Sequence, residues 1–471
     1  MSGGSLSIAL SGLDAAQTGL DTVSENISNA NTPGYLKETA SLANQQTPGD
    51  PIGNGVTVTG ILQSSNSFNR QLELSANAAQ SYANQMQSLL TSAQGSFNEP
   101  SSNGIAEQMN TMFNDFSNVA DTPSQPAAYL QLQASAQNVA TAINQAAANL
   151  TATYNQAASS ASTLVGTINS QLQQVASINT QLASTSLTPG ASNTLVDQQN
   201  QVIDKLASEL GVTSIPGNAG QTTLLVGGVA LVQGGQASSI SFSPGTQTEP
   251  PSLSQLATVT LQSSGTTVPV SGGTLGATLT ALNTNLPSYG ARLNSLASSL
   301  VSQINAVIPN GTTTCPLFGT LVGSSFSGSS TAPQLNAQTL SANPQFASTY
   351  ATLSTLSASQ LASDGPAFQA AANLQTATSV PSPSGTGTQP SSMAQWASSV
   401  AQVGLDVQNA TANATNATNV YNQAYSAEQS VSGVSVNSQL VNLVNYQQQY
   451  QAAAKVISTV AATLQSLIQD V

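Results

Sequence analysis

The two ends of the chain carry the clearest pattern of hydrophobic and polar positions. Near the start, apolar residues recur at alternating spacings of three and four, which places them on one face of a helix. These residues are Leu6, Leu10, Leu13, Leu20 and Ile27. The pattern stops at Asn31-Thr32-Pro33-Gly34, because Pro33 disfavours helix at the residue before it and Gly34 allows a turn.

The last segment of the chain repeats this pattern on a longer helix. Its stripe consists of Leu440, Leu443, Tyr450, Ala454, Ile457, Ala461, Leu464, Ile468 and Val471, and Val444 widens it. A helix of this length would extend about 45 Å at the usual rise per residue. We predict that the two end helices pair with each other and with copies in neighbouring subunits. The alternative is that each helix packs on its own domain.

The interior alternates between helical and β-rich segments. Residues 55–62 alternate like a strand, and glycine punctuates the β-rich segment 211–273. Helical spacing covers 68–210, with turns at 122–126 and 188–190, then 274–308, where Pro287 can kink the helix, and 391–429 with an interruption. The fold class expected is multidomain and mainly α, with coiled-coil-like paired end helices, a central helical bundle and a small inserted β domain.

We expect four structural units. They are a polymerisation domain of 1–67 with 431–471, a central helical domain of 68–210 with 274–308 and 391–430, a β domain of 211–273, and a loop-rich insertion of 309–390 that is rich in Ser, Thr, Gly and Pro.

The composition excludes several classes of function. Charged residues make up 5% of the chain and there are five Lys and Arg residues, which are far apart in sequence, so a basic patch for nucleic acid is not expected. There is no histidine and one cysteine, Cys315, which removes the usual general base, the usual metal ligands and a disulfide framework. No triad, metal cage or phosphate loop occurs. We therefore expect no enzyme activity, no metal, no cofactor and no membrane insertion.

The low charge also suggests a chemical environment. Carboxylates are partly protonated in an acidic medium, where ion pairs lose strength, so we hypothesise that the composition suits acidic surroundings. The first residues lack a cationic lead and a continuous apolar run, so we expect export without a cleavable signal peptide.

Two motifs resemble one known family. Ala30, Asn31, Thr32, Pro33, Gly34 and Tyr35 follow the first helix and resemble, in compressed form, the N-terminal signature of the flagellar rod, hook and hook-associated proteins. The closing segment from Leu440 to Thr459, with its Asn-Leu, Gln-Tyr and Ala-Lys-Val-Ile series, is similar to the last helix of the same family. Acidic residues usual in that helix are replaced by Asn, Ser, Gln and Ala here.

The helical interior indicates which kind of member the chain resembles. Rod and hook proteins usually continue into β domains, whereas this chain is helical from about residue 68, as in the hook-associated members. The resemblance implies a non-catalytic adaptor at the hook–filament junction of an extracellular flagellum. It also implies four partners: copies of itself, the hook protein, a second junction protein next to the filament, and an export chaperone at the C-terminal helix. The alternatives are a hook or rod subunit, or a surface adhesin with a helical stalk.

Overall fold

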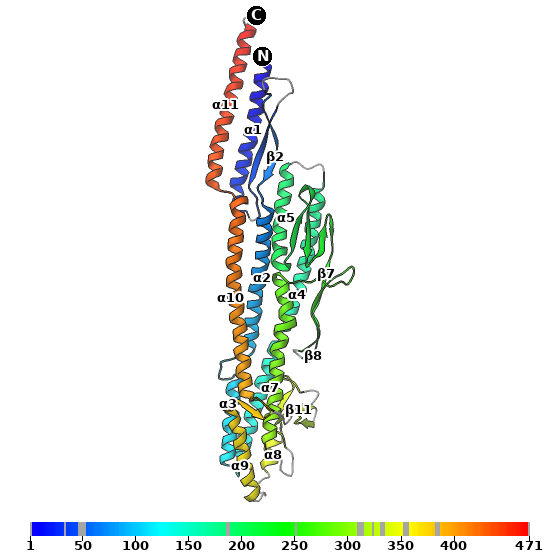
Figure 1. Ribbon diagram of the computed structural model, residues 1–471, viewed down its shortest axis with the longest axis vertical. Helices are drawn as coiled ribbons and strands as arrows, with labels where there is room; N and C mark the ends of the chain where they lie inside the picture. Colours follow the sequence, from blue (N-terminus) through cyan, green and yellow to red (C-terminus); the bar gives the residue numbers. More distant parts are fainter. Residues whose placement is uncertain are drawn as a thin grey trace.

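The structure is a computed structural model of an elongated protein whose two chain ends lie side by side at one end (Figure 1). It describes residues 2–32, 34–45, 53–184, 189–249, 252–308, 315–322, 325–329, 335–351, 358–381 and 387–469. Among these residues helices predominate and the sheets are small and antiparallel, so the expected mainly α, multidomain fold class is confirmed.

The end unit contains the first and last helices and one hairpin. Helix α1 (Ser2–Ser28) runs beside α11 (Val436–Gln469). Strands β1 (Glu38–Asn44) and β2 (Val56–Gln63) pair in antiparallel register, with Glu38 opposite Gln63 and a shift of register after Ser41. Both strands contact α1.

A shaft of long helices follows. It consists of α2 (Ser67–Ser96), α4 (Pro126–Leu182), α5 (Pro189–Leu210), α6 (Gly273–Thr280), the π-helical turn η2 (Ala281–Asn285), α7 (Leu286–Val307) and α10 (Ser392–Ser432). The Asn66 side chain caps α2 and the Ser391 side chain caps α10 by accepting from backbone N–H groups of the first turn. Helix α10 is continuous, whereas the sequence predicted an interruption. Its polar Asn-Ala-Thr run remains helical because buried alanines such as Ala410 and Ala414 give it a packed face.

The break expected at Pro287 lies just before it. Helix α6 passes into α7 through η2, and Pro287 occupies the first turn of α7, where its missing N–H needs no intrahelical partner. The hydrophobic pattern did not predict the break between α2 and α3 (Ile105–Asp121). This break lies in a short polar segment without helical spacing of apolar residues.

The β domain lies against the side of α4 and α5 (Figure 1). Its four-stranded sheet has the order β3 (Thr213–Pro216), β4 (Thr222–Val226), β5 (Val229–Gln233) and β6 (Gln236–Ala237), and the 3₁₀ turn η1 (Asn218–Gly220) precedes β4. Two pairs accompany it: β7 (Ile240–Ser243) with β10 (Thr258–Leu261), and β8 (Thr246–Glu249) with β9 (Ser252–Gln255). The chain enters and leaves this domain at Gly211 and Gly272, which touch: a Cβ on Gly211 would lie 2.9 Å from the Cα of Gly272.

A buried asparagine ties the β domain to the shaft. Asn179 on α4 donates to the carbonyls of Thr222 and Gly234 at 2.8 Å each, and its own carbonyl oxygen accepts from Thr222 N–H. Gln199 on α5 donates to the same oxygen. Because every polar atom of this amide is paired, its burial does not leave an unsatisfied group.

The far end of the rod contains most of the segment expected to be a loop-rich insertion. Its described elements are β11 (Phe318–Val322), β12 (Ser325–Ser327), β13 (Leu340–Ala342), α8 (Phe346–Ala351), α9 (Ala358–Ala372), the 3₁₀ turn η4 (Asn373–Gln375), β14 (Ser379–Pro381) and β15 (Thr388–Pro390). Aromatic rings hold this end to α4: Tyr129 stacks on Tyr350 with ring centroids 5.1 Å apart, and Phe368 meets both rings edge-on.

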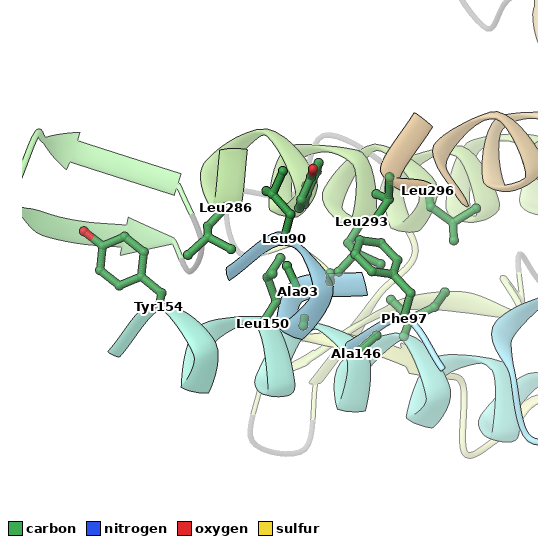
Figure 2. Packing of buried hydrophobic residues seen from close by; sticks show 14 of the residues in the cluster. Leu90, Ala93, Phe97, Ala146, Leu150, Tyr154, Leu286, Leu293 and Leu296 are labelled. Atoms are coloured by element: carbon green, nitrogen blue, oxygen red, sulfur yellow. The ribbon is translucent and has the colours of Figure 1, made fainter. Parts of the chain in front are cut away.

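The core runs along the shaft where α2, α4 and α7 meet (Figure 2). Leu90 and Phe97 of α2 and its end, Leu150 of α4 and Leu293 of α7 are buried there. Phe97 stacks on Trp396 of α10 at 5.5 Å, and the Trp396 indole N–H donates to Glu99. The end unit therefore extends from one end of a well-packed helical shaft (Figure 1).

Candidate functional site

The first and last helices meet through small residues on α1. The buried side chains of α1 include Ala9, Ala16 and Val23, which are spaced by seven residues, and Ala15 beside them. Small side chains let two helix backbones approach closely, and a seven-residue spacing keeps one face turned toward the partner. The pairing of α1 with α11 is therefore close and continuous along α1.

Gly19 provides the closest approach between the two helices. A Cβ at Gly19 would lie 2.5 Å from the ring of Tyr446 on α11, so the ring occupies the space that any other residue would fill. Two turns further along, Asn26 is fully buried, and its Nδ2 lies 3.4 Å from Oε1 of Gln439 on α11. These two contacts set the register of α11 against α1.

The structure separates the predicted assembly residues into two groups. Leu6, Leu13, Leu20, Ile27, Leu443, Ile457 and Leu464 are half-buried, whereas Leu10 is 51%, Leu440 47%, Val444 49% and Tyr450 36% exposed. Positions 443, 450, 457 and 464 share a seven-residue spacing on α11, the one that a seam with α1 requires. The side chain of Ile468 lies outside the described residues.

A second face of α11 remains open. Leu440, Val441, Val444 and Val456 are each 47–61% exposed, with Val441 the most exposed. We call these four residues the outer apolar face. Exposed apolar side chains that gather on one helix mark a surface for protein contact. The end unit thus has an inner seam closed within the chain and an outer apolar face exposed at its surface.

The turn after α1 brings the chain back along the end unit. Thr32 N–H donates to the carbonyl of Asn29, Tyr35 N–H donates to that of Thr32, and Gly34 has a φ of +77°. The Tyr35 hydroxyl donates to Asn26 Oδ1, which also accepts from Glu38 N–H at 2.8 Å. Burial raises the pKa of the Tyr35 hydroxyl, which therefore stays a neutral donor. Pro33 lies outside the described residues.

Behind this turn lies a polar cavity of about 450 Å³. Its lining includes Arg70, Glu73, Asp204 and Glu428. Arg70 pairs with Glu73 at 2.9 Å and with Asp204, and one of its N–H groups also donates to the carbonyl of Asn200. Burial raises the pKa of the Glu73 and Asp204 carboxyls, and Arg70 opposes the rise. The pair of Arg70 with Asp204 connects α2 to α5, whereas the pair of Arg70 with Glu73 lies within α2.

The described residues offer little for other chemistry. They contain no group of three His, Cys, Asp or Glu side chains arranged to hold a metal ion. Across the same residues, no helix is both long enough and apolar enough to span a membrane. The candidate site is the pair of end helices, with its inner seam and its outer apolar face.

Comparisons with known proteins agree at both ends and in the middle. Residues 6–35 match the family model "Flagella basal body rod protein", and residues 426–470 match "Flagellar basal body rod FlgEFG protein C-terminal". Residues 90–324 match "Flagellar hook-associated protein FlgK helical domain". The chain belongs to the flagellar hook-associated protein family.

Relatives of this family cover the same regions at moderate identity. The flagellar hook-associated protein 1 of Escherichia coli K12 is 28% identical over 306 residues, and that of Salmonella typhimurium LT2 is 27% identical over 308 residues. Each alignment covers 63% of this chain and 55% of the relative, so the match spans about half the length of these relatives. The flagellar hook junction protein FlgK from Burkholderia pseudomallei shares the fold, with a TM-score of 0.61 at 17% identity over 77% of this chain and all of that chain.

The sequence did not point to the residues that form the inner seam of this family member. It indicated the leucine stripe of α1, whereas the buried apolar side chains of α1 include Ala9, Ala16 and Val23, and Gly19 makes the close approach to Tyr446 of α11. The available signal was a second stripe of small residues on α1 with the same alternation of three and four. This stripe is not apparent in the hydrophobic pattern, because alanine and glycine contribute little to it.

The family signature turn can be tested at Gly34. We expect Gly34→Ala to destabilise the protein by about 1–2 kcal/mol, because alanine is strained at positive φ and its Cβ would lie 2.8 Å from Gln201 Cγ. The control Gly12→Ala adds a Cβ that meets nothing within 4 Å in α1, so it should stabilise by about 0.5–1 kcal/mol. Urea unfolding of the isolated protein measures both, and shifts of the same sign would contradict this account.

Proposed function

We propose that this protein is a non-catalytic structural component of the bacterial flagellum. It would act as an adaptor at the hook–filament junction that polymerises through its first and last helices. The observation that supports this proposal most is the pairing of α1 with α11 at one end of the rod. Small residues of α1 are buried in this unit, while the outer apolar face stays exposed. The match to the hook-associated helical domain favours the junction over the hook or rod.

The expected partners follow from this placement. Copies of the chain would bury the outer apolar face between neighbours, gaining about 25 cal/mol per Å² of apolar area less the entropy of association. The hook protein would contact the assembly on one side and a second junction protein on the filament side. Before assembly the same face of α11 would be open to an export chaperone. The protein would work outside the cell.

Deletion of the gene tests the proposal. Electron microscopy of the cell surface and assay of the medium for flagellin give the readout. Hooks without filaments, with flagellin shed into the medium, are expected. Absent hooks would instead place the protein in the hook or rod, and normal flagella would overturn a flagellar role and leave a surface adhesin.

A further inference from the structure

The end unit is attached to the shaft by two reciprocal bonds between amides and carboxyls. Gln63 at the end of β2 donates through Nε2 to Asp197 Oδ1 on α5, at 2.9 Å. In the opposite direction, Asn193 on α5 donates through Nδ2 to Glu38 Oε1 on β1, at 2.8 Å. Each amide also donates to a backbone carbonyl across the joint: Gln63 to Asn193, and Asn193 to Ile61. We call these four side chains the amide–carboxyl latch.

Both carboxyls of the latch are shielded from water and lack a cationic partner. Glu38 is 6% and Asp197 8% exposed. In the described part of the chain the ion pairs are those of Arg70 with Glu73 and Asp204, so none reaches the latch. Two buried carboxylates held by neutral donors are stable together only if the cost of desolvation and of their repulsion is relieved.

The surroundings supply more negative charge than positive. Glu25 of α1 and Glu38 both raise the pKa of Asp197 by repulsion, in addition to the larger effect of burial, and the hydrogen bond from Gln63 opposes them. From the segment before β1 come Tyr35, which burial keeps neutral, and Lys37; from α11 comes Tyr446, which lines the same small cavity as Glu38. Strand β2 has no titratable side chain.

We propose that the amide–carboxyl latch is a proton-controlled joint, which holds the end unit more tightly to the shaft as the medium becomes more acidic. A protonated carboxyl keeps a carbonyl oxygen that can accept from the amide, so the bond can persist while the charge disappears. The proposal concerns one intramolecular joint and does not depend on the flagellar role.

The direction of the effect follows from proton linkage. Burial raises the pKa of Asp197 to about 7, whereas an unfolded aspartate titrates near pH 3.9. Between these values the closed joint binds a proton that the open joint does not. Closure is therefore favoured as pH falls from about 7 to about 4, and the advantage is lost as pH rises through 7.

Hydrogen exchange of the full-length protein tests the latch. Protection of β1 and β2 amides, corrected for the intrinsic pH dependence of exchange, is compared with α4 at pH 8 and 5.5. Wild type should gain about tenfold or more in β1 and β2 and much less in α4, by linkage through one proton. Asp197→Asn should lose most of that gain, and the exposed Asp121→Asn should keep it.

The design separates the latch from general effects of acid. If Asp197→Asn opens the joint at both pH values, two other results test the proposal. The hairpin of the wild type should gain protection on acidification, and Glu38→Gln should reduce that gain. A wild-type protein whose hairpin protection is flat or falls on acidification overturns the proposal. So does an Asp197→Asn variant, closed at both pH values, that retains the full wild-type gain.

Discussion

Cells carrying Leu443→Asp or Ile457→Asp are expected to lose motility and shed flagellin, while the shaft of the variant protein stays folded. Both side chains are half-buried on the face of α11 that meets α1. An aspartate there must either bring an unpaired charge into the seam or separate the helices, and separation is the cheaper outcome. Because α11 packs mainly on α1, the damage should stay in the end unit.

Three measurements check this expectation. Motility in soft agar and flagellin in the medium report on assembly, and circular dichroism of the purified variants reports on the shaft. Gln156→Asp, at an exposed polar position of α4 in the shaft, is the control and should remain motile. Normal motility in both seam variants would refute the polymerisation role of the paired helices.

The outer apolar face can be tested separately at Val441. This side chain is 61% exposed, so Val441→Asp should leave the pairing of α1 with α11 intact in the isolated protein. Assembly should nevertheless fail, because the charge would be buried against a neighbouring copy. Hydrogen exchange of α1 distinguishes the two cases: protection should persist in Val441→Asp and fall in Leu443→Asp. Full motility of Val441→Asp would exclude the outer face as an interface.

Leu150→Ala is expected to destabilise the shaft by about 2–5 kcal/mol, the usual cost of a cavity at a buried leucine. Leu150 is 0% exposed and lies beside Leu90 and Ala93 of α2 in the core (Figure 2). The matched control is Leu130→Ala on the same helix, where the side chain is 59% exposed. A surface change of this kind should shift stability by no more than about 0.5 kcal/mol.

Denaturant unfolding followed by tryptophan fluorescence measures both variants. The chain has one tryptophan, Trp396, which stacks on Phe97 in the same core, so its emission reports on the region that Leu150 supports. Equal losses in the two variants would show that the packing of α4 described here is wrong.

The acid hypothesis raised by the composition acquires a structural basis in this chain. Burial raises the pKa of Glu38, Glu73, Asp197 and Asp204 in the folded protein. Each of these groups favours the folded state more as the pH falls toward the pKa of that group in the unfolded chain, since folding then takes up protons. Purified protein should therefore melt no lower at pH 5 than at pH 8, as differential scanning calorimetry can measure. A melting temperature several degrees lower at pH 5 would remove the hypothesis.

Several features followed from the sequence alone because their causes are local. The end of α1 before Gly34, the start of α10 near Ser391 and the break near Pro287 depend on backbone preferences of single residues. The mainly helical class followed from spacing, and the lack of histidine and of clustered cations restricted the chemistry. The motif after α1 and the closing series of α11 identified the family.

The tertiary structure decided which faces meet. Periodicity shows that α1 has an apolar stripe, but not whether that stripe or the neighbouring small-residue stripe faces α11. The small-residue stripe meets α11 at Gly19, which leaves room for the Tyr446 ring, a contact between residues more than 400 positions apart. The same holds for the latch, where Gln63 meets Asp197 and Asn193 meets Glu38 only after α5 has packed beside the hairpin. Local preferences determine which segments are helices and strands, whereas burial and hydrogen bonding between distant segments determine the joint and which face of α11 stays exposed.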